Sequence, residues 1–102
     1  MPRFDIYRNP NPAATHPLFL DVQSNLVRTA TRWCVPLFLP PADFPALTRA
    51  QCHIAIGGEA WLLDAPNILA VPMGLLKVPV HHLLAEEQAL VENALEFMLR
   101  GY

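Results

Sequence analysis

The residues best suited to acid–base or metal chemistry are His53, the adjacent pair His81-His82 and the acidic pair Glu86-Glu87. Adjacent side chains point to opposite faces of a strand, or diverge by about 100° on a helix. His81 and His82 therefore cannot readily share one ion without a third ligand, and no carboxylate cluster offers one. We interpret them as a loop pair before a helix, and we predict neither a metal site nor a cofactor.

His53 lies in an alternating apolar run, Cys52–Ile56. A catalytic histidine needs a nucleophile or carboxylate within hydrogen-bond reach, and the sequence alone indicates none, so we predict a histidine of the core or of an edge strand. Glu86-Glu87 falls in a first helical turn, where negative charge complements the helix dipole. No phosphate-binding glycine loop, HExxH motif or GxSxG motif is present. We therefore expect a protein that is not an enzyme and acts by binding other proteins.

The two cysteines, Cys34 and Cys52, both lie in apolar runs without CxxC spacing. We predict buried free thiols, with a disulfide or a metal pair as the alternative. Residues 1–5 lack the apolar segment of a secretory signal, and no run approaches the ~18 apolar residues of a membrane helix. We expect a cytoplasmic protein, where thiols remain reduced.

The chain has 102 residues, of which 53% are hydrophobic and 16% charged, enough for one ordered domain over residues 1–102. The apolar excess suggests that a partner covers part of the surface. Seven Lys and Arg against nine Asp and Glu give a net charge of −2. A basic stripe for phosphates is absent, so we expect no direct nucleic-acid binding.

Short apolar runs separated by turn formers predict a mainly β fold with α structure at its C-terminus. The predicted strands cover residues 4–7, 18–22, 33–39, 52–56, 60–63 and 69–73. Gly57-Gly58 predicts a hairpin turn. Pro36 lacks an N–H and should lie at a bulge or on an edge strand. Residues 40–45 should hold a short helical turn or none.

A helix is predicted over residues 84–99, which contain neither Gly nor Pro. Its apolar side chains fall within an arc of about 160°; they are Leu90, Val91, Ala94, Leu95, Phe97 and Met98. Glu96 and Arg100 form an i,i+4 pair, and Gly101 should end the helix.

Several segments occur in a recognisable order: Phe19–Ser24, Val35-Pro36-Leu37, His53-Ile54, Val71-Pro72 and the terminal Gly101-Tyr102. In this order and spacing the chain resembles the CcdB family, the toxins of bacterial toxin–antitoxin pairs. The resemblance implies a small SH3-like β-barrel with a C-terminal helix, assembled as a homodimer. It also implies that the A subunit of DNA gyrase is the target, and that a CcdA-like antitoxin neutralises the toxin.

The family motif stands here as Asp21, Val22, Gln23 and Ser24. The resemblance implies a gyrase-binding surface made by Leu26, Val27, Glu96, Leu99, Arg100, Gly101 and Tyr102. Well-studied members end in tryptophan, glycine and isoleucine, so only the glycine is kept, and Glu96 replaces an asparagine.

Two alternatives follow from the same resemblance. The related MazF and Kid toxins share the barrel and cut RNA, for which Arg28, Arg32 and His53 are the candidate residues. The other alternative is a toxin-derived fold whose target has been lost or changed.

Overall fold

The computed structural model describes residues 3–41, 43–44 and 48–101. Its strands are β1 (Asp5–Arg8), β2 (Leu18–Asp21), β3 (Thr31–Phe38), β4 (Gln51–Ile56), β5 (Glu59–Asp64), β6 (Leu69–Pro72) and β7 (Pro79–His82). Two short 3-10 turns, η1 (Ala65–Asn67) and η2 (Met73–Leu75), flank β6, and helix α1 (Ala85–Arg100) closes the chain.

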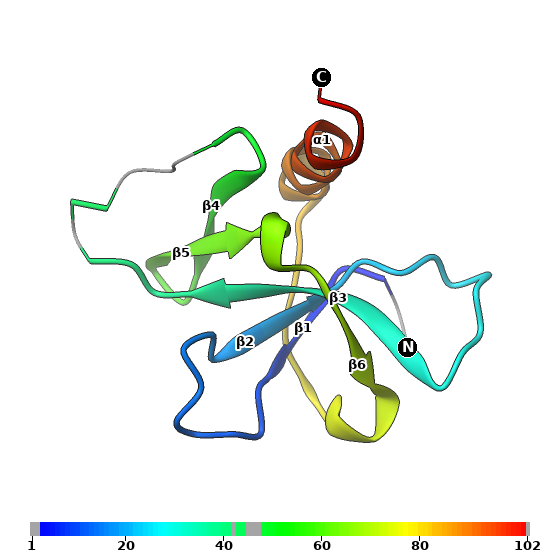
Figure 1. Cartoon of the computed structure of the whole chain (residues 1–102). Coiled ribbons are helices and arrows are strands. Elements are labelled where there is room, and N and C mark those ends of the chain that lie inside the picture. Colours follow the sequence, from blue (N-terminus) through cyan, green and yellow to red (C-terminus); the bar gives the residue numbers. More distant parts are fainter. Residues whose placement is uncertain (1–2, 42, 45–47, 102) are drawn as a thin grey trace.

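The seven strands form one antiparallel sheet in the order β4-β5-β3-β2-β1-β7, with β6 paired to β3 off this path. Figure 1 shows the sheet curling into a half-barrel with α1 at one end. This confirms the expected mainly β fold with a C-terminal helix. The buried core combines Ile6, Leu20, Val35, Leu37, Ile54 and Leu63 from the strands with Val91 and Ala94 from α1.

Strand β3 is the centre of the sheet, and Pro36 lies in its interior. The expectation of a bulge or an edge strand for Pro36 is wrong. On one side β3 pairs with β2 in an unbroken register. On the other side residues 31–34 pair with β6 and residues 37–38 with β5. Pro36 lies between these two partners, where a strand can lack an N–H without breaking a ladder.

The β4–β5 hairpin turns at Gly57 and Gly58, both at positive φ (59° and 83°), as the sequence predicted. Such a turn needs positive φ at both central residues. Of the segment expected to hold a short turn or none, residues 40–41 and 43–44 are in neither helix nor strand. Ala42 and Pro45 lie outside the described residues.

Helix α1 begins one residue later and ends one residue later than predicted. Leu84 N–H donates to the Glu87 carboxylate at 3.0 Å, which explains the acidic first turn. Gly101, at φ 81°, ends the helix and donates its N–H to the Phe97 carbonyl. The described part of the chain contains no helix that could cross a membrane.

The loop interpretation of His81-His82 is wrong, because both residues belong to β7, which pairs with β1. His82 Nδ1 lies 2.6 Å from the Asp5 carboxylate, and His81 is half-buried near Glu87. The two side chains thus have different partners. No metal-binding group of three or more ligating side chains occurs among the described residues.

Candidate functional site: a groove between the Asp21–Thr31 segment and the end of the helix

Asp21, the first residue of the family motif, is completely buried and forms an ion pair with buried Arg32. Arg32 Nε donates to Asp21 Oδ2 at 2.8 Å, and its terminal nitrogen donates to Oδ1 at 3.0 Å. Two parallel bonds of this kind are the strong, geometrically specific form of a carboxylate–guanidinium contact. Asp21 therefore fixes the end of β2 to the start of β3.

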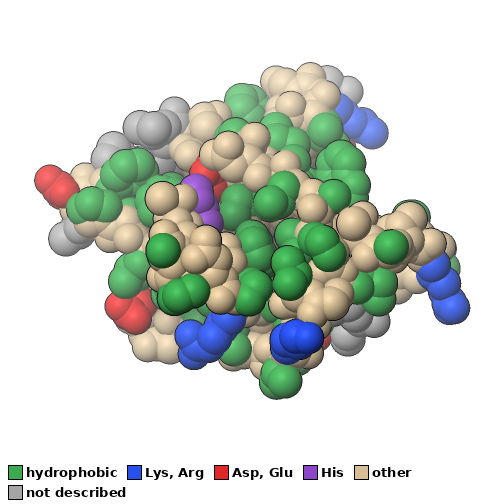
Figure 2. Space-filling model, turned by 60° about the horizontal axis from the view of Figure 1, so that its bottom comes forward, with side chains coloured by type: hydrophobic (Ala, Val, Ile, Leu, Met, Phe, Trp, Pro, Cys, Tyr) green, Lys and Arg blue, Asp and Glu red, His purple; other side chains and the backbone are tan. Residues whose placement is uncertain are grey.

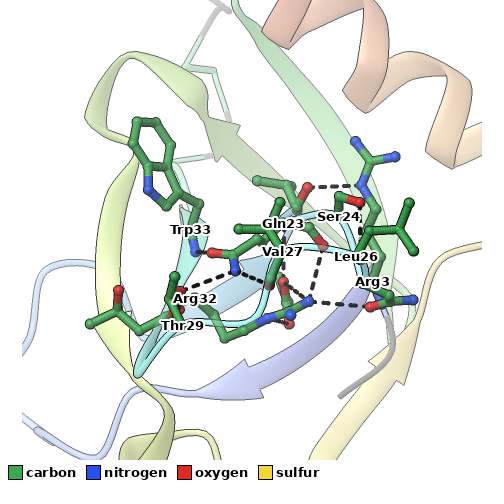
Figure 3. A network of polar contacts seen from close by, with 12 residues as sticks. Arg3, Gln23, Ser24, Leu26, Val27, Thr29, Arg32 and Trp33 are labelled. Carbon is green, nitrogen blue, oxygen red and sulfur yellow. Dashed lines mark hydrogen bonds and ion pairs between the residues drawn. The ribbon is translucent and has the colours of Figure 1, made fainter.

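Gln23 holds the loop that follows. Its side-chain nitrogen donates to the Val27 carbonyl at 2.7 Å, and its oxygen accepts the Trp33 N–H at 2.9 Å. Arg32 also donates to the Gln23 carbonyl and to Asn25. Figure 3 shows how these contacts fold the loop back onto β3. The Asp21–Ser24 motif thus fixes the conformation of the loop.

Arg3 connects this loop with the helix. Its Nε donates to the Val22 carbonyl at 2.8 Å, and its backbone N–H donates to Asn25 Oδ1. The guanidinium lies 3.8 Å from the carboxylate of Glu92 on α1. Sequence reasoning missed Arg3, since nothing in the spacing of residues 3 and 92 indicates that they meet.

A groove of about 650 Å³ lies between the loop and the helix. Its apolar lining comes from three regions of the chain: Val22, Val27, Trp33, Ile68, Leu95, Met98 and Leu99. Four charged side chains also line it: Arg3, Glu92, Glu96 and Arg100. Glu96 and Arg100 lie 3.6 Å apart and are both exposed. The groove thus combines an apolar interior with charges of both signs.

The residues implied for target binding divide into two sets. Val27, Glu96, Leu99 and Arg100 line the groove, as do the motif residues Val22 and Gln23. Leu26 is 92% exposed on the loop, next to Val27, and Gly101 is exposed at the helix end. Ser24 is also exposed, and its hydroxyl accepts the Leu26 N–H. Tyr102 lies outside the described residues.

The three candidates for RNA cleavage do not converge. Arg32 is buried against Asp21, Arg28 is exposed on the loop, and His53 is exposed on β4. His53 instead lines a separate hollow with Phe44 and Glu59. His53 does lie on an end strand of the sheet, as one of our two interpretations predicted.

Both cysteines are free, as predicted. Cys34 is fully buried, whereas Cys52 is half-buried beside the core. Burial raises the pKa of the Cys34 thiol to about 12, and the negative charge of Asp21 adds to the shift. Burial raises the pKa of Cys52 to about 11. Neither thiol has the low pKa of a reactive cysteine.

A sequence model of the CcdB protein family matches residues 3–101. The chain belongs to the CcdB family. This match confirms the resemblance inferred from the ordered motifs. No curated protein matches the sequence.

The fold is similar to that of a solved structure described as an endoribonuclease in complex with its cognate antitoxin from a mycobacterial species. The TM-score is 0.78 and the identity 17%, over 97% of this chain and 95% of that chain. The expectation that the protein is not an enzyme is contradicted by this finding, because the same fold occurs in a protein described as an enzyme. Family membership and this likeness together support a toxin of a toxin–antitoxin pair.

Proposed function

We propose that this protein is the toxin of a type II toxin–antitoxin system and that it binds the A subunit of DNA gyrase through the groove. One observation carries the proposal. Val27 from the loop, and Glu96, Leu99 and Arg100 from the helix, are far apart in sequence and line the same groove. These are residues for which the family resemblance implies target contact.

The chemistry of this surface suits a protein partner. Leu26 and Leu99 are 92% and 73% exposed, so burying them against a partner would remove apolar area from water. Arg100 supplies an aliphatic stem and a planar cation, which stacks on aromatic rings and pairs with carboxylates. It is a different anchor from the tryptophan of well-studied members, and we expect it to select an acidic or aromatic feature of the target.

We further propose that residues 1–102 act as one domain and assemble as a homodimer, which a cognate antitoxin neutralises. Strand β6 supports the dimer, because within the described chain it pairs only with β3 and leaves one edge open. An open edge of this kind readily pairs with another chain. Trp33, Leu69 and Met73 add exposed apolar side chains on and beside β6.

The test of gyrase targeting is a supercoiling and DNA-cleavage assay with the wild-type protein and with Arg100→Trp. We expect the wild-type protein to inhibit supercoiling and to stabilise cleaved DNA, and Arg100→Trp to strengthen both effects. If only Arg100→Trp acts on gyrase, the scaffold is competent and the natural protein has another target. Inactivity of both proteins at high excess would contradict the proposal.

A second candidate function is RNA cleavage. It is favoured by the likeness of the fold to a chain described as an endoribonuclease. Incubation of the purified protein with single-stranded RNA would test it, with cleavage expected. RNA that stays intact after prolonged incubation would contradict this candidate and leave the gyrase proposal untouched.

A further inference from the structure

The backbone at Phe4 has an unusual conformation close to the groove. Phe4 has φ 73°, and among the described residues it is the only one other than glycine with a positive φ. For a bulky side chain this is a strained conformation, of the kind that clusters at functional sites. The surrounding structure imposes it: the Phe4 N–H donates to the Asp21 carbonyl at 2.7 Å, and its carbonyl accepts the Leu83 N–H at 3.2 Å.

The conformation of Phe4 determines where Arg3 lies. In an extended strand, residues two positions apart face the same side. Arg3 and Asp5 do not, because strand β1 begins only at Asp5, whose carboxylate contacts His82. Arg3 instead folds back, so that its guanidinium lies 4.5 Å from the centroid of the Phe4 ring. The strained residue thus directs Arg3 toward the groove, which Arg3 lines.

The contacts of Arg3 differ in strength. Its Nε donates to the Val22 carbonyl at 2.8 Å, a part-buried hydrogen bond from a charged group, which is about twice as strong as a neutral one. Its backbone N–H also donates to the Asn25 side chain at 3.1 Å. The ion pair with Glu92 is longer, at 3.8 Å, and the Glu92 side chain is 56% exposed, so this pair contributes little. Arg3 is therefore anchored mainly to the loop.

The loop that Arg3 anchors carries two exposed apolar side chains. Leu26 is 92% exposed and Val27 49% exposed. Gln23 ties this loop to β3 through the Val27 carbonyl, and Arg3 ties its beginning at Val22 and Asn25. Side chains that are ordered before binding avoid an entropy cost when a partner arrives. Fixing the loop at both points therefore favours association.

We propose that Arg3 is a positioning residue for target binding. It holds Leu26 and Val27 in the orientation in which they meet the A subunit of gyrase, and it acts through the loop and not by its own contact with that subunit. The inference rests on the proposed function. It adds a residue at the opposite end of the chain from the helix.

A general attraction by positive charge is the alternative explanation for an effect of Arg3. The chain has a net charge of −2, and the Lys and Arg side chains on the face drawn in Figure 2 stand apart from one another. Steering by charge needs a surface dominated by one sign. A control at another arginine separates the two explanations.

The first test is a calorimetric titration of the gyrase A subunit with Arg3→Gln. We expect about tenfold weaker binding than wild type, the cost of ordering two side chains on association. Arg8→Gln is the matched control, because Arg8 is exposed at the end of β1 and does not line the groove. It should bind like wild type. Arg3→Lys keeps the charge without the planar fork and should bind almost as weakly as Arg3→Gln.

Double-mutant cycles test whether Arg3 acts through the loop. When Leu26 and Val27 are both replaced by Ala, Arg3→Gln should change the affinity less than twofold, because the side chains that it positions are gone. In a Leu99→Ala background, with the loop intact, the tenfold loss should remain. Full additivity in both backgrounds would show that Arg3 acts independently of the loop and would overturn the proposal.

A spectroscopic readout does not depend on the partner. In free Arg3→Gln, the backbone amide NMR signals of residues 24–27 should shift and show increased mobility, while those of residues 94–99 in α1 stay in place. Unchanged loop signals, or full binding by Arg3→Lys, would overturn the role of Arg3 and keep the gyrase proposal. A wild-type protein that does not bind the A subunit would overturn both.

Discussion

Asp21 and Arg32 are the most consequential single residues, because they place two opposite charges in the core beneath the groove. Removing one partner of such a pair leaves an uncompensated buried charge. We expect Asp21→Ala to lower the free energy of unfolding by about 3–5 kcal/mol, measured by urea denaturation.

The matched control for that pair is Glu96 with Arg100, an exposed ion pair one turn apart on α1. Exposed pairs of this kind contribute about 0.3–0.5 kcal/mol. Glu96→Ala should therefore leave the unfolding midpoint almost unchanged. Equal losses from Asp21→Ala and Glu96→Ala would show that the buried network does not hold the loop.

The buried thiols make stability fall in alkaline solution. The ordinary pKa of a thiol here is 9.0, and Cys34 in the folded protein has a pKa of about 12. Between these values the folded state binds more protons than the unfolded state, so its stability is complete below pH 9 and falls as pH rises. Each such thiol contributes a slope of about 1.4 kcal/mol per pH unit.

Urea denaturation at several pH values from 8 to 10.5 would measure that slope. Cys34→Ala should show a shallower decrease than the wild-type protein, while Cys52, whose pKa is about 11, still contributes. An identical slope in both proteins would contradict the role assigned to Cys34.

Sequence reasoning predicted the roles of some individual residues correctly and missed others. It identified the Asp21–Ser24 motif by resemblance and Gly101 as the helix stop from its type. It placed Arg32 among RNA-cleaving candidates, whereas the structure buries it against Asp21. It missed Arg3 and its contacts with Val22 and Glu92, since they depend on how distant segments fold together.

The β4–β5 hairpin provides a test at the level of secondary structure. Gly58 has φ 83°, and a Cβ added there would contact nothing within 4 Å, so only backbone strain opposes a side chain. Gly58→Ala should therefore cost about 1 kcal/mol.

Gly74, in η2, is the matched control because its surroundings are equally open and its φ is not in the positive range. Gly74→Ala should be neutral or should stabilise the protein slightly. Thermal unfolding of both variants would measure the difference. Equal effects would mean that the positive φ of the hairpin is not the constraint.

The strands and the helix were predicted well, because alternation and helical spacing are local signals. The prediction failed at residues whose structure depends on which strands pair with each other. Pro36 is tolerated in a central strand because β3 changes partner from β6 to β5 beside it. His81 and His82 become a strand because β1 is there to pair with them. Neither fact is encoded within a short window of sequence.

At the scale of the whole molecule, the open edge of β6 and the exposed Trp33 and Met73 lead us to expect a dimer. Sedimentation should give twice the 11.4 kDa mass of the chain. Met73→Asp should weaken the dimer, whereas Leu84→Asp, at the exposed residue that precedes α1, should not. A monomer at all concentrations would contradict the proposed assembly.

The central claim is that the groove and the helix end bind the A subunit of gyrase. A calorimetric titration of that subunit with three proteins tests it most directly: wild type, Leu99→Asp and Leu84→Asp. Leu99 and Leu84 are both exposed, 73% and 60%, and belong to opposite ends of α1. We predict binding by wild type and Leu84→Asp and its loss in Leu99→Asp. Absence of binding by the wild-type protein, or equal binding by all three, would contradict the claim.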